Sequence, residues 1–197
     1  MLRSPSVLVM ALVAFLVLAV EYILLIPIAY TIGLKYNLTN EVFVGACFIP
    51  NGIGNMIGAP LAGRLSDRIV TQFKAKRGSW YPEDRLRVAI LPALTLIPLS
   101  ALASGILTTY VDGPVGLAGN LICLFVNGFG IDMVLSPCSA YLVDILHSES
   151  AETMAAVNAF RAVLLSFCIM GIFPMVENWG VLATDIIAAL LGWLSFG

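Results

Sequence analysis

Six long, mainly apolar runs dominate this sequence and limit what it can fold into. A helix needs about 20 such residues to cross the hydrocarbon core of a bilayer. The sequence predicts an all-α membrane protein, because 60% of its residues are hydrophobic and only 11% are charged, too few charges for a water-soluble domain. The six predicted transmembrane helices lie near residues 6–33, 41–63, 88–109, 115–146, 153–176 and 181–197.

The basic residues are distributed unevenly between the predicted loops. Seven of the ten Lys and Arg residues lie in 64–87, whereas Lys35 alone lies between the first two runs. Cytoplasmic loops carry the excess of Lys and Arg, so 64–87 is predicted to be a cytoplasmic loop and Arg3 also faces the cytoplasm. With six spans, both termini are then cytoplasmic. The glycosylation sequon Asn37-Leu38-Thr39 lies in the predicted exterior loop and agrees with this orientation.

The sequence offers little for catalysis or metal binding. His147 is the only histidine, and there is no phosphate-binding G-x-x-x-x-G-K-[ST] loop. A membrane-embedded enzyme would need a clustered catalytic set, which is lacking. We therefore expect neither an enzyme, a metal nor another cofactor, and no nucleic acid as a partner. The cysteines lie inside apolar runs without paired spacing, which argues against a zinc site or a disulfide framework: Cys47, Cys123, Cys138 and Cys168.

The second run carries polar and small residues on one helical face. Gly54-x-x-x-Gly58 would let another helix backbone approach closely. Asn51 and Asn55, one turn apart, are harder to explain by packing alone, and they either line a cavity or pack between helices. The residues that share this face by the 3.6-residue period are Cys47, Asn51, Gly54, Asn55, Gly58 and Ala62.

The fourth run carries a second set of polar residues. Asp132, Ser136 and Ser139 share one face, and Asn127 and Ser136 are candidates to line a cavity. The run also holds Gly128, Gly130 and Pro137, which predict a bendable helix because neighbouring groups must satisfy the freed backbone.

Charged side chains also occur inside the runs, among them Glu21, Asp132 and Arg161. Glu21 and Asp132 are carboxylates within the membrane, where a charge is costly and a protonated or ligand-bound acid is tolerated. Each is either a proton- or substrate-binding group or a hydrogen-bonded structural acid. Arg161, about two turns into the fifth run, either extends to the cytoplasmic surface or pairs with Asp144. We expect a structural ion pair between Asp144 and Arg161 rather than contact of Arg161 with a ligand.

The charged end of the second run resembles a known signature. Gly63-Arg64-Leu65-Ser66-Asp67-Arg68 is similar to the "G-x-L-a-D-r" motif of the major facilitator superfamily, although Ile69-Val70-Thr71 follows where that family has Gly and two basic residues. In the family, the acid of this motif lies at a helix end and helps to latch the outward-facing state. The resemblance implies a cytoplasmic gate motif formed by Gly63, Arg64, Asp67 and Arg68.

Longer stretches resemble the C-terminal half of fungal drug:proton antiporter-type facilitators. They are GSWYPEDRLRVAILPA (78–93), NGFGIDMVLSPCSAYLVD (127–144) and VNAFRA (157–162). The resemblance implies helices seven to twelve of a twelve-helix transporter, built as two inverted three-helix repeats in a plasma or vacuolar membrane. It also implies a small organic substrate, protons as the coupling ion, and an N-terminal half with which the substrate site is shared.

Two functions follow from this resemblance. The first is a secondary active transporter that exchanges drugs, polyamines or similar molecules for protons across the lipid bilayer. The second is a non-transporting fragment or truncated gene product, since the chain holds six spans rather than twelve.

Overall fold

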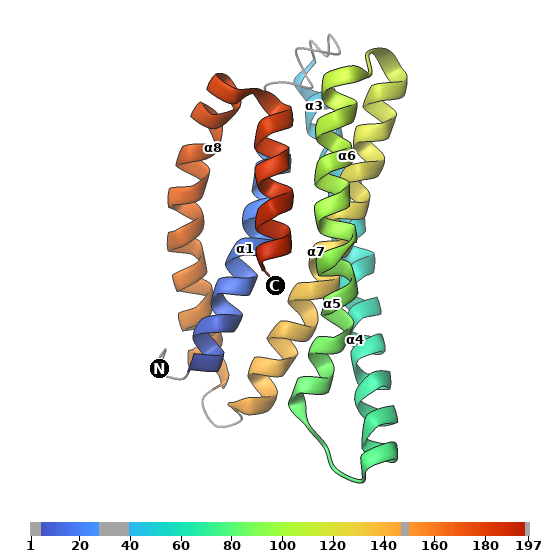
Figure 1. Ribbon diagram of the computed structural model, residues 1–197, viewed down its shortest axis with the longest axis vertical. Coiled ribbons are helices and arrows are strands. Elements are labelled where there is room, and N and C mark those ends of the chain that lie inside the picture. The colour runs from blue at the N-terminus through green and yellow to red at the C-terminus, as the bar shows by residue number, and fades with distance from the viewer. Residues whose placement is uncertain (1–4, 28–39, 147–149, 196–197) are drawn as a thin grey trace.

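The computed structural model describes residues 5–27, 40–146 and 150–195, and every regular element in these ranges is a helix (Figure 1). Arg3, Lys35, the sequon 37–39 and His147 lie outside the described residues. The helices are α1 (Pro5–Pro27), α3 (Glu41–Ala46), α4 (Ile49–Arg77), η2 (Pro82–Leu86), α5 (Arg87–Leu94), α6 (Leu96–Tyr110), α7 (Gly113–Ile145) and α8 (Ser150–Leu194).

Five stretches of the described residues are long and apolar enough to cross a membrane. The last of them, Ala151–Leu194, contains a sharp turn at Gly180, whose φ of 81° is accessible to glycine at low cost. The chain therefore reverses within α8, and its two legs, 150–179 and 181–194, run in opposite directions (Figure 1). This turn coincides with the predicted boundary between the fifth and sixth spans. The protein is an all-α, multi-pass integral membrane protein.

Two predicted boundaries differ from the structure. The expected loop 64–87 is largely helical, because α4 continues to Arg77 and ends at Gly78, whose φ of 74° closes the helix. Small and apolar residues keep one face of this extension buried, and the basic residues of the last turn suit the helix dipole. The third predicted span is interrupted at Thr95, which separates α5 from α6.

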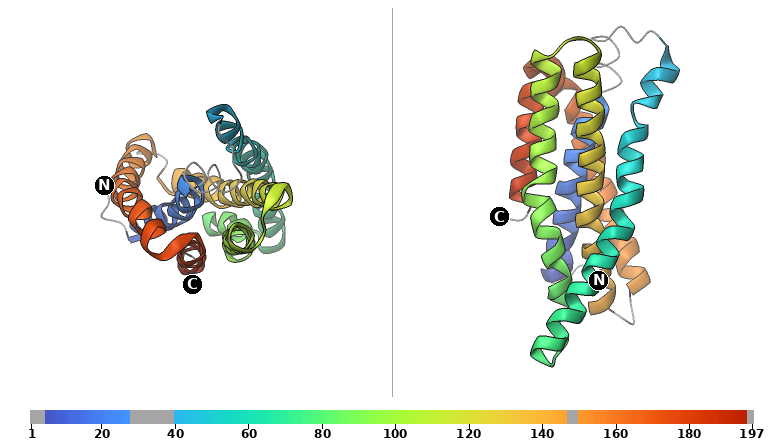
Figure 2. Two further views of the ribbon diagram at one scale, coloured as in Figure 1. Left: turned by 90° about the horizontal axis from the view of Figure 1, so that it is seen from above. Right: turned by 90° about the vertical axis from the view of Figure 1, so that its right-hand side faces the viewer.

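Helix α7 runs through the middle of the bundle (Figure 2). It packs most extensively against α4 and also contacts α6, α5 and α1, whereas α8 packs mainly on α1 and α6. The core between these helices includes Val17 and Val20 of α1, Ile97 of α6 and Ile131 of α7, each no more than 1% exposed. This arrangement places the polar residues of α1, α4 and α7 next to one another.

Candidate functional site

Glu21 of α1 is bound by both asparagines of α4. The side-chain amide of Asn51 donates to Glu21 Oε1 at 2.9 Å, and that of Asn55 donates to the same oxygen at 3.2 Å. Glu21 is 8% exposed, so the carboxylate lies inside the bundle. Two N–H donors satisfy a buried carboxylate oxygen without a cation. The structure thus brings together Glu21 and the polar face of α4, two features that the sequence analysis had identified separately.

Glycines bring α4 and α7 close enough to enclose this group. A Cβ added at Gly58 would lie 2.7 Å from the carbonyl oxygen of Phe129, and one at Gly54 would lie 2.8 Å from the Phe129 nitrogen. Gly128 of α7 performs the reciprocal role, because a Cβ there would lie 2.5 Å from Asn51 Oδ1 and 2.8 Å from Asn55 Oδ1. The predicted role of Gly54 and Gly58 in close helix approach is confirmed.

Asp132 and Ser136 of α7 face α4 on the same side as Gly128. The Cβ of Asp132 lies 3.3 Å from the position of a Cβ built on Gly58, and Ser136 Oγ donates to the Ala59 carbonyl at 3.5 Å. Asp132 is partly buried and lies within electrostatic reach of Glu21. Two acids and two asparagines therefore meet at the junction of α1, α4 and α7. We call Glu21, Asn51, Asn55 and Asp132 the central polar site.

Asn127 does not join this site. Its side chain is 1% exposed, and its amide donates to Ser100 Oγ of α6 at 3.0 Å. It precedes Gly128 by one residue, and this step of about 100° around a helix turns it from α4 toward α6. The structure thus places Asn127 in an interhelical contact rather than beside Asn51 and Asn55.

The acid of the gate motif is held by an arginine that the sequence reading did not single out. Arg85 of η2 donates through Nη1 to Asp67 Oδ1 at 2.7 Å, and its Nε donates to Asp144 of α7. Arg85 thereby connects α4 to α7 at one end of the bundle. In the described part of the chain, Arg64 and Arg68 form no ion pair with Asp67, and Gly63 has open space where a side chain would lie.

The expected ion pair between Asp144 and Arg161 is wrong. Asp144 is bound by Arg85 instead. Arg161 belongs to α8, which packs far more extensively on α1 than on α7. Arg85 reaches Asp144 because η2 packs directly against both α4 and α7.

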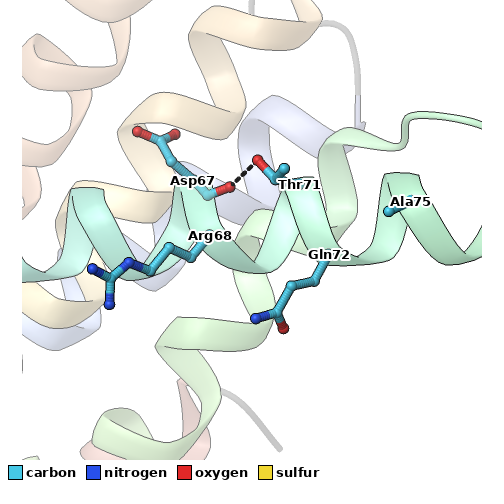
Figure 3. A pocket seen from close by; sticks show the side chains of 5 residues that line it. All are labelled: Asp67, Arg68, Thr71, Gln72 and Ala75. Carbon is cyan, nitrogen blue, oxygen red and sulfur yellow. Dashed lines mark hydrogen bonds between the residues drawn. The ribbon is translucent and has the colours of Figure 1, made fainter.

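A pocket of about 440 Å³ borders the gate motif (Figure 3). It lies along the face of α4 formed by Asp67, Arg68, Thr71, Gln72 and Ala75 and is open to the surroundings. Thr71 Oγ1 donates to the Asp67 carbonyl at 2.7 Å, which fixes this hydroxyl to the helix. The Arg68 and Gln72 side chains extend away from the α4 backbone in different directions (Figure 3).

A second charged cluster lies next to the gate motif and was not predicted from the sequence. Asp84 is 4% exposed and accepts from Arg77 at 3.4 Å and from Arg87 at 3.1 Å. Both guanidinium groups also lie over the Phe73 ring, 4.8 Å and 4.5 Å from its centre. The cation–π contacts and the shared acid hold the end of α4 against the start of α5. The Arg77–Asp84 and Arg87–Phe73 contacts could not be inferred from spacing, since these partners meet only after the chain turns at Gly78.

The helical bundle, with buried acids between its helices and a charged motif at one helix end, defines an all-α, multi-pass membrane protein. The chain belongs to the Major Facilitator Superfamily, whose family model matches residues 1–169.

Relatives among curated fungal proteins include the MFS antiporter QDR3 of Candida albicans, 27% identical over 97% of this chain and 27% of that protein. The MFS-type transporter penM of Penicillium rubens is 30% identical over 81% of this chain and 30% of that protein. Quinidine resistance protein 3 of Saccharomyces cerevisiae is 25% identical over 74% of this chain and 20% of that protein. The chain thus spans less than a third of the length of these relatives. No solved structure matches it.

Proposed function

We propose that this chain forms part of a secondary active transporter that exchanges small organic molecules for protons, with Glu21 as the group that binds both. Family membership supports transport, and the curated relatives include a protein named as an antiporter and one named for quinidine resistance. The observation that carries the proposal is the Glu21 carboxylate, buried on α1 and held by two amides of α4.

The chemistry of Glu21 suits exchange between a proton and a cation. Its buried carboxylate is satisfied by amide donors alone, and no Lys or Arg among the described residues forms an ion pair with it. A proton or a cationic substrate can therefore supply the missing positive charge, and the two compete for one site. Asp132, within electrostatic reach, makes two simultaneous negative charges costly and favours occupation of the site.

The contacts of Arg85 provide the conformational part of the proposal. Arg85 connects Asp67 of α4 to Asp144 of α7. The central polar site lies between the same two helices, so a movement of one helix relative to the other would affect both. If α4 moves relative to α7 during transport, the bridge must break, so it stabilises one conformation over the other. We propose that this bridge is the cytoplasmic gate contact.

The test replaces Glu21 by glutamine in a transporter that contains this chain, reconstituted in vesicles with an imposed pH gradient. Glu21→Gln keeps the size and the hydrogen-bonding capacity but removes the titratable group. We expect loss of gradient-driven accumulation with normal membrane insertion, and a greater loss for cationic than for neutral substrates. Glu152→Gln, an exposed acid at the start of α8, is the matched control and should transport normally.

The competing function is a membrane fragment that does not transport. An unaltered protein that moves no substrate under any gradient would favour it. Gradient-driven transport that survives Glu21→Gln would instead keep transport and remove Glu21 from the coupling role, with Asp132 as the next candidate.

A further inference from the structure

Asp185 of α8 is a buried acid that does not belong to the central polar site. Its side chain belongs to the second leg of α8, five residues after the turn at Gly180, and is 2% exposed. Its Oδ1 is buried and has no hydrogen-bond partner. It therefore differs from Glu21, whose Oε1 accepts two amide donors.

The surroundings of Asp185 provide no counter-charge. The α6 residue that faces it is Gly105, and a Cβ added there would lie 2.9 Å from the Asp185 Cβ and 3.0 Å from Oδ2. The Cys123 thiol of α7 lies within electrostatic reach of Asp185, and no Lys or Arg of the described residues forms an ion pair with that acid. An isolated buried carboxylate is prohibitively costly when charged, so the acid is neutral in this conformation.

Beside Asp185, a row of hydrogen-bonded polar side chains runs between α6 and α7. Ser104 and Thr108 of α6 both donate to Asn120 Oδ1, at 2.8 Å and 3.2 Å. Ser100, one turn along α6, accepts from Asn127 of α7 at 3.0 Å. All five are at most 8% exposed. We call these five side chains the polar row.

The polar row consists of two hydrogen-bonded groups, and in the described residues neither group is hydrogen-bonded to Glu21 or Asp185. Its Thr108 end lies next to the end of α6 at Tyr110, on the side of the bundle opposite η2 (Figure 1). Its Asn127 end precedes Gly128, which packs directly against Asn51 and Asn55. Asp185 faces Gly105, the neighbour of Ser104 in the row. Polar groups between membrane helices also strengthen packing, but that role does not require an acid without a partner.

We propose that Asp185 is a second proton-binding site of this half, separate from Glu21 and located on the exterior side in the predicted orientation. The acid holds its proton while the leg 181–194 packs on Gly105 of α6. When the leg separates, water reaches the carboxyl group, the O–H bond breaks and the proton passes to water, leaving a solvated carboxylate. The turn at Gly180 is the hinge for this movement, because its glycine conformation interrupts the helix there. The exterior location and the direction of proton flow rest on the proposed function.

The first test uses the unaltered chain in lipid vesicles and needs no transport. Dicyclohexylcarbodiimide adds to a protonated carboxylic acid: the acid proton moves to a carbodiimide nitrogen, the carboxyl oxygen bonds to the central carbon, and acyl transfer yields a stable N-acylurea. We expect mass spectrometry to find the adduct on Asp185 and much less on the exposed Glu177 of the same helix at neutral pH. Labelling of Asp185 should fall as the pH rises. Absence of labelling at every pH would overturn the proposal.

The second test measures substrate exchange against exterior pH in a transporter that contains this chain. A step limited by one proton changes by up to about tenfold per pH unit. Asp185→Asn should remove the part of the exterior-pH dependence that this proton contributes and leave Glu21-dependent coupling in place, whereas Glu177→Gln should change neither. An unchanged exterior-pH profile in Asp185→Asn would reduce Asp185 to a permanently neutral structural acid and overturn the proposal.

The two tests separate this inference from the proposed function. If the unaltered protein shows no gradient-driven transport, the proposed function fails while the labelling of Asp185 still decides whether it binds a proton reversibly. If Asp185→Asn fails to insert into the membrane, the labelling of the unaltered chain still decides whether Asp185 binds and releases a proton.

Discussion

Gly128 of α7 packs so closely against Asn51 and Asn55 of the central polar site that adding one methyl group there should have a large effect on stability and transport. Gly128→Ala would place a Cβ 2.5 Å from Asn51 Oδ1 and from the Asn51 carbonyl oxygen, and 2.8 Å from Asn55 Oδ1. Ordinary contact between such atoms requires about 3.5 Å, so α7 and α4 must separate by about 1 Å. The three crowded atoms are the side-chain oxygens of Asn51 and Asn55 and the backbone carbonyl oxygen of Asn51. Rotation of one side chain therefore cannot relieve the crowding, because the other two atoms remain in place.

Overpacking of this kind costs about 1–3 kcal/mol, which corresponds to roughly 5- to 150-fold in the unfolding equilibrium. The same displacement would lengthen the 3.2 Å bond from Asn55 to Glu21 beyond hydrogen-bonding range. We therefore expect Gly128→Ala to lower both stability and coupled transport.

The control for this substitution lies on the opposite face of α4. Gly52 has nothing within 4 Å of an added Cβ and is exposed, so Gly52→Ala should stabilise the helix or leave it unchanged. Both variants would be compared by denaturant unfolding in mild detergent and by substrate exchange. Equal stability of the two variants would refute the argument that α4 and α7 are in backbone contact at Gly128.

The remaining predictions concern the charged end of the bundle. Arg85→Lys removes the guanidinium group that binds two acids at once, so it should lower the free energy of unfolding by roughly 1 kcal/mol and reduce transport by a larger factor. Arg161→Lys changes a residue that does not take part in this bridge and should leave stability and transport unchanged. Asp67→Asn should lower transport with normal membrane abundance, and normal transport would make Asp67 an ordinary surface charge. A cysteine at Ser79 should resist a membrane-impermeant thiol reagent in intact cells, while one at Asn178, after the reversal of the chain, should react. The opposite pattern would invert the predicted topology.

Much of the helix pattern could be predicted from the sequence, because burial follows a period within each helix. The buried face of α4 at Asn51, Gly54, Gly58 and Ala62 confirms the predicted shared face. The continuation of α4 to Arg77 was missed because a rule based on hydropathy ends a span where charges begin. A helix can extend beyond the bilayer, and here its buried face continues through Ser66 and Val70.

Partners between helices could not be predicted in the same way. Periodicity fixes the face of a residue but not the helix that the face meets. Asp144 and Arg161 lie on adjacent spans and were paired for that reason, whereas Arg85 reaches Asp144 from a short helix between α4 and α5. Asn127 was a candidate to line a cavity because it is polar within an apolar run, whereas in the structure it is hydrogen-bonded to Ser100 of α6. Asp185 was not singled out from the sequence, because the feature that distinguishes it, a buried oxygen without a hydrogen-bond partner, exists only in the folded bundle.

The two buried acids differ in what would happen if the helices around them moved. Glu21 would lose amide donors from α4, so separation of α1 from α4 exposes a carboxylate that then needs water, a proton or a cation. Asp185 has no donor on Oδ1 to lose, so separation of α8 from α6 only admits water and lowers the cost of its charge. Movement at the first acid therefore favours binding of a positive charge, whereas movement at the second favours release of a proton. A rearrangement that opened both contacts together would bind at one place and release at the other, which is the order of events that exchange of a proton for a cation requires.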